Sequence, residues 1–541
     1  MKKNVPPEAV SPGLRSYEVL IFLTGAVTLA LEILASRIMT PYFGVSLYIW
    51  AGILSITLIF LALGYHLGGL ISQRREKEAL PHLMLAAPLA AAFAIVLATV
   101  LYPVLFPRLA TVNLVLASFL GGTLLLSLPL VVLSAMNPLL IALGRDARSS
   151  GDAGAGRVFF ISTVGSVAGV VITAFLVIPH LTNFRALLWL SLGLGLVVAL
   201  LTCLSREISR PLKKRLLSGC AVVVLMGGGL LVGQHAYFRL LAGMSDIGKN
   251  FELLAEYTSV FGNIKVVEAR PENPQRKPAL AYLQDGIIQN LVTTDGVVLD
   301  HTGFICRLIS LYAPAGRHSL VLGMAAGMIP RYLYQQGGKV TAVEINPNSL
   351  EAATKFFHFN PREVDFHQED ARTFVRRHPD SYDLVVADLF QGDCTPDYLL
   401  TQEFFQEVRA CLRPSGVVII NTWFDPANEK VNDTILATVA AAFPHLLEFL
   451  SPSSAGLISS VCLVAASVPL SPQPAIELAD RQALPPKDYA TLKAARVVHR
   501  QSLKGIQPVS DDHNIFSILF AGSQLRYRSQ LNQLPPNLLV N

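Results

Sequence analysis

Short apolar runs in the second half of the chain end in acidic residues. Glu344 closes the run VTAVE, and Asp388 closes the run YDLVVAD. Ligands of open α/β sheets bind beyond the carboxyl ends of the strands, so acids in these positions face a ligand site. Glu344 also lies 21 residues after Gly323, close to the spacing of about 20 at which an acid reaches a ribose hydroxyl. The pattern indicates a site for a nucleoside-bearing cofactor.

The turn at 323–327, which precedes the run that ends at Glu344, is poorer in glycine than a dinucleotide-binding turn. It reads Gly323-Met324-Ala325-Ala326-Gly327, with only its ends able to adopt every backbone conformation freely. The turn by itself therefore does not identify the ligand.

The elements that position these acids alternate between strand and helix. Short strands are expected at 263–268 and 281–283, and a helix at 302–312. Further strands, separated by helical segments, are expected at 319–322, 340–344, 364–367, 384–387 and 417–421. This order predicts an α/β Rossmann-like domain of methyltransferase type, preceded by a small β-hairpin subdomain.

The first half of the chain is too apolar for a soluble domain. The whole chain is 52% hydrophobic and 15% charged, against roughly 25% charged in typical soluble domains. Uncharged runs of about 17 to 25 residues recur before Gln234, each long enough to cross a bilayer as a helix. Spans are expected at 17–39, 47–71, 83–106, 112–133, 158–178, 186–204 and 217–233. We therefore expect a multi-pass α-helical transmembrane bundle with the lipid bilayer as its partner.

The domain order follows from these patterns. We expect a cytoplasmic segment at 1–16, a transmembrane domain of about seven spans at 17–233, and a linker with the hairpin subdomain at 234–312. The Rossmann-like domain with a C-terminal extension follows at 313–541. Within the bundle, the spacing of Gly165 and Gly169 predicts close helix packing.

Other functional classes find little support in the composition. The six cysteines form no C-x-x-C pair, which predicts neither structural zinc nor disulfides, and no metal site is expected. The net charge of +5 comes largely from loops of the apolar half, and no aromatic-interleaved basic stripe indicates nucleic-acid binding.

With these elements placed, the second half resembles the spermidine synthase family, polyamine aminopropyltransferases with a methyltransferase-like fold. Residues 256–266 (EYTSVFGNIKV) resemble the family's opening hairpin, and 283–289 (LQDGIIQ) its D-G-x-x-Q turn. Residues 343–346 match its V-E-I-D strand end, 369–371 its G-D-A/G step, and 387–405 its gatekeeping loop and next helix. The likeness covers about 256–420.

The first half is similar to that of the membrane-fused members of this family. The likeness rests on 29–50 (LALEILASRIMTPYFGVSLYIW), 64–69 (GYHLGG) and 156–179 (GRVFFISTVGSVAGVVITAFLVIP). All these motifs occur in the family's order.

The resemblance implies transfer of the aminopropyl group of decarboxylated S-adenosylmethionine to a polyamine such as putrescine, with release of methylthioadenosine. Decarboxylated S-adenosylmethionine is then a co-substrate, and no prosthetic group is needed. Soluble members of the family form dimers, so a homodimer is one assembly that the resemblance allows.

The resemblance also assigns roles to the acids. Asp388 is the expected catalytic residue, because the amine must arrive neutral and a carboxylate can take its proton; its alternative role is to cap a turn. Glu344 is expected to bind the ribose hydroxyls. Asp370 is expected to bind the adenine amino group, with Ala371 supplying its backbone, and Asp370 can also serve as a helix N-cap.

Other residues complete the expected site. Gly323 and Gly327 would let the backbone approach the methionine-derived part of the ligand, unless they serve only the packing of the turn. Pro396 belongs to the cofactor side through the gatekeeping loop. Asp285 and Gln289 are expected on the substrate side, although an Asp-Gly hairpin turn would look the same.

Departures from the family pattern fall on the amine side. Ala326 replaces an acid that contacts the amine end of both substrates. Cys306 and Arg307 stand where the family has its Y-H-E helix, and the second acid of the gatekeeping loop is lost or shifted to Asp393.

Two alternative functions therefore stay open. One is a membrane-tethered methyltransferase that uses S-adenosylmethionine, whose carboxylate Arg307 would suit. The other is a non-catalytic polyamine- or nucleoside-binding or transport-coupled module.

Charge predicts the orientation in the cell membrane. Basic residues precede the first span and follow the second, fourth and sixth: Lys2, Lys3, Arg15; Arg74, Arg75, Lys77; Arg145, Arg148, Arg157; Arg206, Arg210, Lys213, Lys214 and Arg215. The positive-inside rule puts the amino terminus and these loops in the cytoplasm. A seventh crossing would carry the second half to the opposite face, unless 217–233, with its Gly227-Gly228-Gly229 run, fails to cross. The supply of adenosyl cofactors favours the cytoplasmic face.

Overall fold

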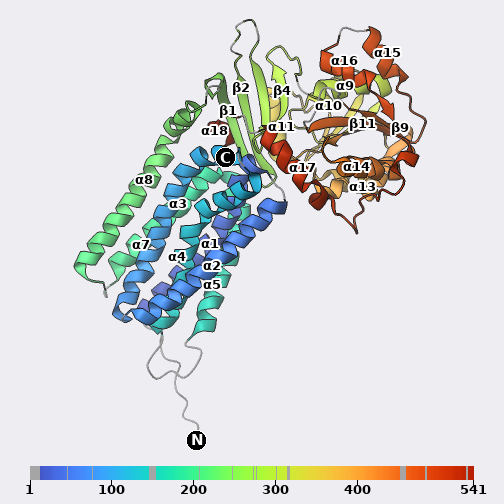
Figure 1. The fold of residues 1–541 in the computed structure, drawn as a ribbon. Coiled ribbons are helices and arrows are strands. Elements are labelled where there is room, and N and C mark those ends of the chain that lie inside the picture. Colours follow the sequence, from blue (N-terminus) through green and yellow to red (C-terminus); the bar gives the residue numbers. More distant parts are fainter. Residues whose placement is uncertain are drawn as a thin grey trace. The chain divides into compact units, whose positions relative to one another are not determined.

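The computed structural model describes residues 12–44, 47–75, 77–111, 113–144, 154–205, 208–245, 248–271, 273, 275, 277–299, 301–313, 317–450, 458–481, 484–531 and 534–541. These residues form two compact units (Figure 1). The helical unit contains the described residues of 12–43, 48–245 and 535–541, and the α/β unit contains those of 44–47 and 246–534.

The helical unit is built from long apolar helices. They are α1 (Pro12–Phe43), α2 (Leu47–Arg74), α3 (Leu80–Ala110), α4 (Leu114–Gly144), α5 (Ala155–Ile172), α6 (Ile178–His180), α7 (Asn183–Leu204) and α8 (Arg210–Ala242). A 3-10 turn, η1 (Lys77–Ala79), precedes α3, and a π turn, η2 (Thr173–Val177), joins α5 to α6. Counting 155–180 as one span, seven described helices are long and apolar enough to cross a membrane. The predicted multi-pass helical fold is confirmed.

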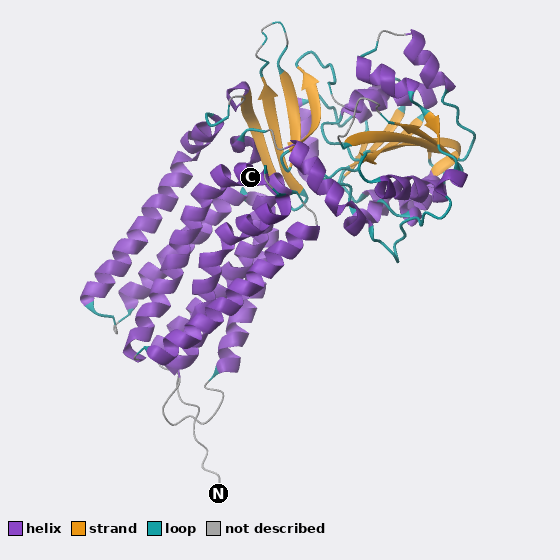
Figure 2. Cartoon of the chain, in the orientation of Figure 1, coloured by secondary structure: helices purple, strands orange, loops and turns teal. Residues whose placement is uncertain are grey.

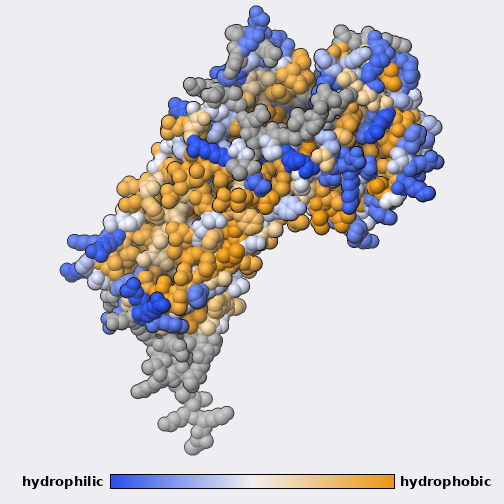
Figure 3. Space-filling model, in the orientation of Figure 1, coloured by the Kyte–Doolittle hydropathy of each residue, from blue (hydrophilic) through white to orange (hydrophobic). Residues whose placement is uncertain are grey.

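The surface of this unit carries large apolar side chains. Leu58, Phe160 and Leu225 are among those that are more than half exposed. Figure 3 shows hydrophobic residues over most of the visible face of the helices. Such a surface suits lipid, because a monomeric soluble protein rarely exposes so much contiguous apolar area.

Glycines set the packing of α1 against α5. A Cβ on Gly165 would lie 2.1 Å from the carbonyl oxygen of Phe22, and one on Gly169 would lie 2.2 Å from that of Ala26. These helices can pack this closely only without side chains at the contact. The predicted packing role of Gly165 and Gly169 is confirmed.

The ends of the helical unit differ from the predicted boundaries. Helix α8 runs without a break through Gly227-Gly228-Gly229 and continues past Gly233 to Ala242. Residues 535–541, assigned from sequence to the Rossmann-like domain, pack in the helical unit, with Leu538 buried and the Phe184 amide donating to the Asn541 carbonyl at 2.8 Å. Because α8 is unbroken, the expected cytoplasmic position of the α/β unit depends on cofactor supply alone.

Several residues used for these predictions lie outside the described residues. They are Lys2, Lys3, Arg145, Arg148, Arg206 and the start of the fourth expected span, Val112.

Two sheets make up the α/β unit (Figure 2). The first is antiparallel, in the order β1 (Phe251–Ser259), β2 (Gly262–Ala269), β3 (Ala279–Gln284) and β4 (Ile287–Thr293), and follows a 3-10 turn, η3 (Gly248–Asn250). The second has eight strands in the order β12-β10-β11-β9-β8-β5-β6-β7. Its parallel part comprises β5 (His318–Leu322), β6 (Lys339–Val343), β7 (Asp365–His367), β8 (Tyr382–Ala387) and β9 (Leu412–Phe424). Its antiparallel extension comprises β10 (His445–Phe449), β11 (Ser459–Ala466) and β12 (Arg496–Val497).

Helices cover this second sheet. They are α9 (His301–Tyr312), α10 (Met328–Gln335), α11 (Pro347–Phe356), α12 (Ala371–Arg376), α13 (Gln402–Cys411), α14 (Glu429–Ala442), α15 (Gln473–Arg481), α16 (Pro486–Lys493) and α17 (Phe516–Leu531). The 3-10 turns η4 (Asp397–Leu399) and η5 (Arg500–Leu503) lie between them, and α18 (Pro536–Leu539) belongs to the helical unit.

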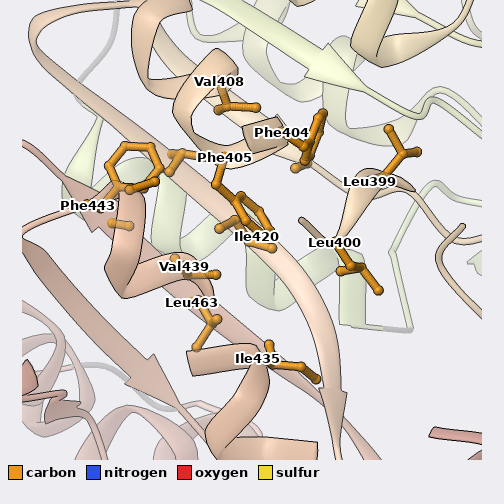
Figure 4. Packing of buried hydrophobic residues seen from close by; sticks show 14 of the residues in the cluster. Leu399, Leu400, Phe404, Phe405, Val408, Ile420, Ile435, Val439, Phe443 and Leu463 are labelled. Carbon is orange, nitrogen blue, oxygen red and sulfur yellow. The ribbon is translucent and has the colours of Figure 1, made fainter. Parts of the chain in front are cut away.

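Apolar side chains from the parallel strands and from α13 and α14 form one core. Phe404 and Val408 of α13 and Val439 of α14 are fully buried against Ile420 of β9 (Figure 4). The alternation of strand and helix read from the sequence thus produces a doubly wound sheet, and the predicted fold class is confirmed.

Every strand expected from the sequence is present, with shifted ends. The antiparallel strands β10, β11 and β12 were not foreseen. Strand β11 contains the apolar run VCLVAA, and Pro452 and Gly456 precede it in the sequence, so a strand signal was present there but was not used.

Gly323 controls how the ends of β5 and β8 approach each other. Its φ is +84°, and a Cβ there would lie 2.1 Å from the carbonyl oxygen of Asp388. Gly337 has a similar φ of +78°, but nothing lies within 4 Å of its missing Cβ. Substitutions at these two positions therefore distinguish the cost of a left-handed backbone from the cost of steric overlap.

We expect Gly323→Ala to destabilise the α/β unit far more than Gly337→Ala. The left-handed backbone costs an L-residue about 1–2 kcal/mol at either position, and only Gly323→Ala adds the overlap with Asp388. The measurement is the melting temperature of the α/β unit in the detergent-purified full chain, with protease resistance of that unit as the readout of melting. Equal shifts for the two variants would contradict the close contact.

Candidate active site

The acids predicted from the sequence meet at one edge of the parallel sheet. Gly323, Glu344 and Asp388 directly follow β5, β6 and β8, and Asp370 lies three residues after β7. Because parallel strands end at the same edge, these residues line one cleft of about 880 Å³. We call it the acidic cleft. Of the predicted site residues it includes Gly323, Glu344, Asp370, Ala371, Asp388, Pro396 and Gln289.

Glu344 holds the turn that follows β5. Its Oε2 accepts hydrogen bonds from the amides of Met324 (3.0 Å) and Ala325 (3.3 Å), and its Oε1 accepts one from Asn346 (2.9 Å). Burial raises the pKa of Glu344 above its ordinary value of 4.5, although these hydrogen bonds act in the opposite direction. A carboxylate has about four acceptor positions and these amides occupy three, so about one position remains for a ribose hydroxyl.

The amides of the turn itself are all used within the protein. Besides the two bonded to Glu344, the Gly323 amide donates to the Val343 carbonyl, Ala326 to Asn290 Oδ1 (3.0 Å), and Gly327 to the Met324 carbonyl. Phosphate and carboxylate ligands in other folds commonly bind to the free amides of such turns. This turn has no amide left for an anion.

Asp370 combines the two roles foreseen for it. It is the N-cap of α12, accepting from the Thr373 amide at 2.8 Å, and it also lines the acidic cleft. Its Oδ2 accepts from the Tyr398 hydroxyl at 2.6 Å. Burial works to raise the pKa of Asp370, but the hydrogen bonds from Tyr398 and Thr373 outweigh it and lower the pKa. The carboxylate is therefore kept ionised.

Asp388 contacts residues that the sequence analysis did not identify. Its Oδ1 accepts from Asn421 Nδ2 at 2.8 Å, and the Oδ1 of Asn421 accepts from the Ser460 hydroxyl. His301 Nε2, at the start of α9, lies 3.8 Å from Asp388 Oδ2. Asn421 stood at the end of an expected strand and could have been found by the same edge argument. His301 carried no such signal.

Two predicted residues, Gly327 and Asp285, do not line the cleft. A Cβ on Gly327 would lie 2.6 Å from the Phe359 ring, so packing of the α10 start requires this glycine. Asp285, with φ +48°, occupies the β3–β4 turn, and its Oδ1 accepts from the Asn263 amide at 2.9 Å. Gly327 thus matches its alternative role in packing the turn, and Asp285 matches its alternative role in an Asp-Gly hairpin turn.

Asp393 and Arg307 also lie away from the cleft lining. Asp393 is buried, with its Oδ2 3.9 Å from Arg528 Nη1 of α17; burial raises its pKa and Arg528 opposes this shift. Arg307 donates from Nε to Asp488 of α16 at 2.9 Å. The cleft lining thus includes neither Asp393, the alternative position for the second gatekeeping acid, nor Arg307, which the methyltransferase alternative would place beside a ligand carboxylate.

The charge of the cleft has one sign. Four of its described lining residues are acidic, namely Glu344, Glu369, Asp370 and Asp388, and none of the described lining residues is lysine, arginine or histidine. Glu369 is paired with Arg377, which lies outside the lining. Such a cleft attracts cations and disfavours a ligand that carries a carboxylate.

The chain matches the family model described as a methyltransferase domain over residues 320–416. It is 30% identical to the polyamine aminopropyltransferase of Vibrio vulnificus over 152 residues, which are 27% of this chain and 50% of that protein. It is 37% identical to an N-terminal histidine N-methyltransferase of Emericella nidulans over 114 residues, 20% of each chain. The chain thus spans half or less of the length of these curated relatives.

Among solved structures, a probable spermidine synthase from Corynebacterium glutamicum aligns with a TM-score of 0.40 and 18% identity, covering 48% of this chain and 96% of that chain. The sequence relatives include polyamine aminopropyltransferases from both Vibrio vulnificus and Bifidobacterium longum, the latter 30% identical over 25% of this chain and 31% of that protein. The α/β unit is thus similar in sequence to part of these polyamine aminopropyltransferases and to methyltransferase domains.

Proposed function

We propose that the α/β unit moves the aminopropyl group of decarboxylated S-adenosylmethionine to an amine and releases methylthioadenosine. The observation that carries this proposal is a lining whose described charged residues are all acidic, combined with a turn whose amides are all used internally. The family resemblance names a polyamine such as putrescine as the expected acceptor.

The nucleoside end of the ligand would lie against Glu344 and Asp370. A ribose hydroxyl would donate to the remaining acceptor position of Glu344, and the adenine amino group would donate to Asp370, beside the backbone of Ala371. Each of these contacts asks for an ionised acceptor, and the lowered pKa of Asp370 supports that state.

The transfer step would take place at Asp388. The acceptor arrives as an ammonium and loses one proton to the Asp388 carboxylate, which leaves a neutral amine. The nitrogen lone pair then attacks the carbon next to the sulfonium. The carbon–sulfur bond breaks, its electron pair goes to sulfur, and neutral methylthioadenosine leaves while the new secondary amine carries the positive charge. Asn421 would keep the Asp388 carboxylate in position by its hydrogen bond.

The same features disfavour intact S-adenosylmethionine. Its carboxylate would enter a cleft with four carboxylates and would find neither a basic residue in the described lining nor a free turn amide. The decarboxylated form avoids both the repulsion from the four carboxylates and the burial of a carboxylate without a hydrogen-bond partner.

A methyltransferase is the second candidate, because residues 320–416 match a methyltransferase-domain model. It would use intact S-adenosylmethionine and release S-adenosylhomocysteine. A non-catalytic binding or transport-coupled module would bind the nucleoside without turnover.

The product identifies the reaction. We expect purified full-length protein with decarboxylated S-adenosylmethionine and a panel of amines to release methylthioadenosine, measured by chromatography. Release of S-adenosylhomocysteine from the intact cofactor would favour the methyltransferase, and binding without any release would favour the module.

Asp388→Asn should abolish turnover while leaving methylthioadenosine binding within a few-fold of wild type. Loss of a general base typically costs about 10²–10⁴ in rate, and Asp388 is not at the nucleoside end. Asp512→Asn, in an exposed loop, is the matched control and should keep full activity. Unimpaired turnover by Asp388→Asn would remove the catalytic assignment.

Glu344→Gln should weaken methylthioadenosine binding itself by about 10- to 100-fold, the usual worth of hydrogen bonds to a charged acceptor. Because the pKa of Glu344 is raised above 4.5, its ionised form is lost as pH falls, starting at a higher pH than for an ordinary glutamate. Wild-type affinity should therefore fall over that acidic range, and the Glu344→Gln variant should lack this dependence. Calorimetric titrations at several pH values measure both; identical profiles would refute the ribose assignment.

A further inference from the structure

Three glutamines form a second wall of the acidic cleft. Gln284 ends β3, Gln289 lies in β4, and Gln391 belongs to the loop that begins with Asp388. All three line the cleft. We call them the amide wall.

The amide wall presents oxygens. Gln284 Nε2 and Gln391 Nε2 both donate to the Phe261 carbonyl, at 3.2 and 3.1 Å, and Gln289 Nε2 donates to the Gly392 carbonyl at 2.8 Å. Turning any of these amides around would put an oxygen against a carbonyl oxygen, so the neighbours fix the orientation. Each amide therefore keeps its Oε1 atom, beside one further N–H, for a ligand.

Among the described residues, none of the three positions at which a further carboxylate was considered adds one to the amide wall. Asp285 is bonded to the Asn263 amide, Asp393 faces Arg528, and the side chain of Ala326 is fully buried in an apolar cluster. None of these three residues, Asp285, Asp393 and Ala326, lines the cleft. At the transfer end, Asp388 is the acid available, and the attacking nitrogen uses it.

This arrangement bears on the far end of the acceptor. A second ammonium would leave water for amide oxygens without an opposite charge, which costs more than burying a neutral donor that makes the same hydrogen bonds. A hydroxyl or amide N–H satisfies the Oε1 atoms at a lower desolvation cost. Phe261, which also lines the cleft, offers an apolar surface for the methylenes between the two ends.

We propose that the amide wall binds the remote end of the acceptor, and that the cleft takes amines whose remote end is an uncharged hydrogen-bond donor in preference to diamines. This inference rests on the proposed aminopropyl transfer. It adds a substrate class and assigns substrate contacts to Gln284 and Gln391.

Three acceptors that differ only in their remote group test the inference. Full-length protein and decarboxylated S-adenosylmethionine are combined with 4-amino-1-butanol, 1,4-diaminobutane or butylamine, and kcat/KM is measured from methylthioadenosine release. We expect 4-amino-1-butanol to exceed each of the others by at least about tenfold, equivalent to 1.4 kcal/mol. A preference for 1,4-diaminobutane, or equal rates for 4-amino-1-butanol and butylamine, would overturn the inference while leaving aminopropyl transfer intact. No release with any amine would overturn the proposed function, and the inference with it.

Variants of the exposed Gln391 locate the effect. Gln391→Glu should move the preference towards 1,4-diaminobutane by at least about tenfold, because it adds the missing charge. Gln391→Met should bring 4-amino-1-butanol down towards butylamine. Gln501→Glu, at an exposed glutamine of η5, is the control and should leave the preference unchanged. Unchanged methylthioadenosine affinity in each variant shows that the nucleoside end is intact. A preference that stays constant in Gln391→Glu would refute the assignment.

Discussion

The close contact between Gly323 and the Asp388 carbonyl is the constraint on which the site depends. It allows the turn after β5 and the loop after β8 to meet without an intervening side chain. Glu344 then fastens the turn from the next strand through two backbone amides. Both Asp388, the expected proton acceptor, and Glu344, the residue expected to bind ribose, thus contact the same turn.

The cleft that results selects its ligand by charge. Its carboxylates suit a sulfonium and an ammonium, and the turn that would hold an anion in other nucleotide folds has spent its amides on Glu344, Asn290 and backbone carbonyls. The proposed acceptor side is different, because glutamine amides stand where the family resemblance led us to expect acids. In the proposed arrangement, a strongly charged nucleoside end therefore lies beside a nearly neutral acceptor end.

The sequence predicted the parts of this arrangement that follow from local pattern. Apolar runs located the parallel strands, and the rule that strand ends share an edge brought Glu344, Asp370 and Asp388 together. Residues whose setting depends on distant contacts were not predictable in this way. Arg528 faces Asp393 and donates to the Asp285 carbonyl from far along the chain, and Phe359 packs on Gly327. The amide wall was missed, apart from Gln289, because glutamine has no positional signature.

Comparing the two forms of the cofactor tests the central claim most directly. The dissociation constants of decarboxylated and intact S-adenosylmethionine should be measured by calorimetry on the same full-length protein, without any amine. The account predicts at least about tenfold tighter binding of the decarboxylated form, since the carboxylate finds no partner in the cleft. Equal affinity, or tighter binding of the intact cofactor, would contradict it.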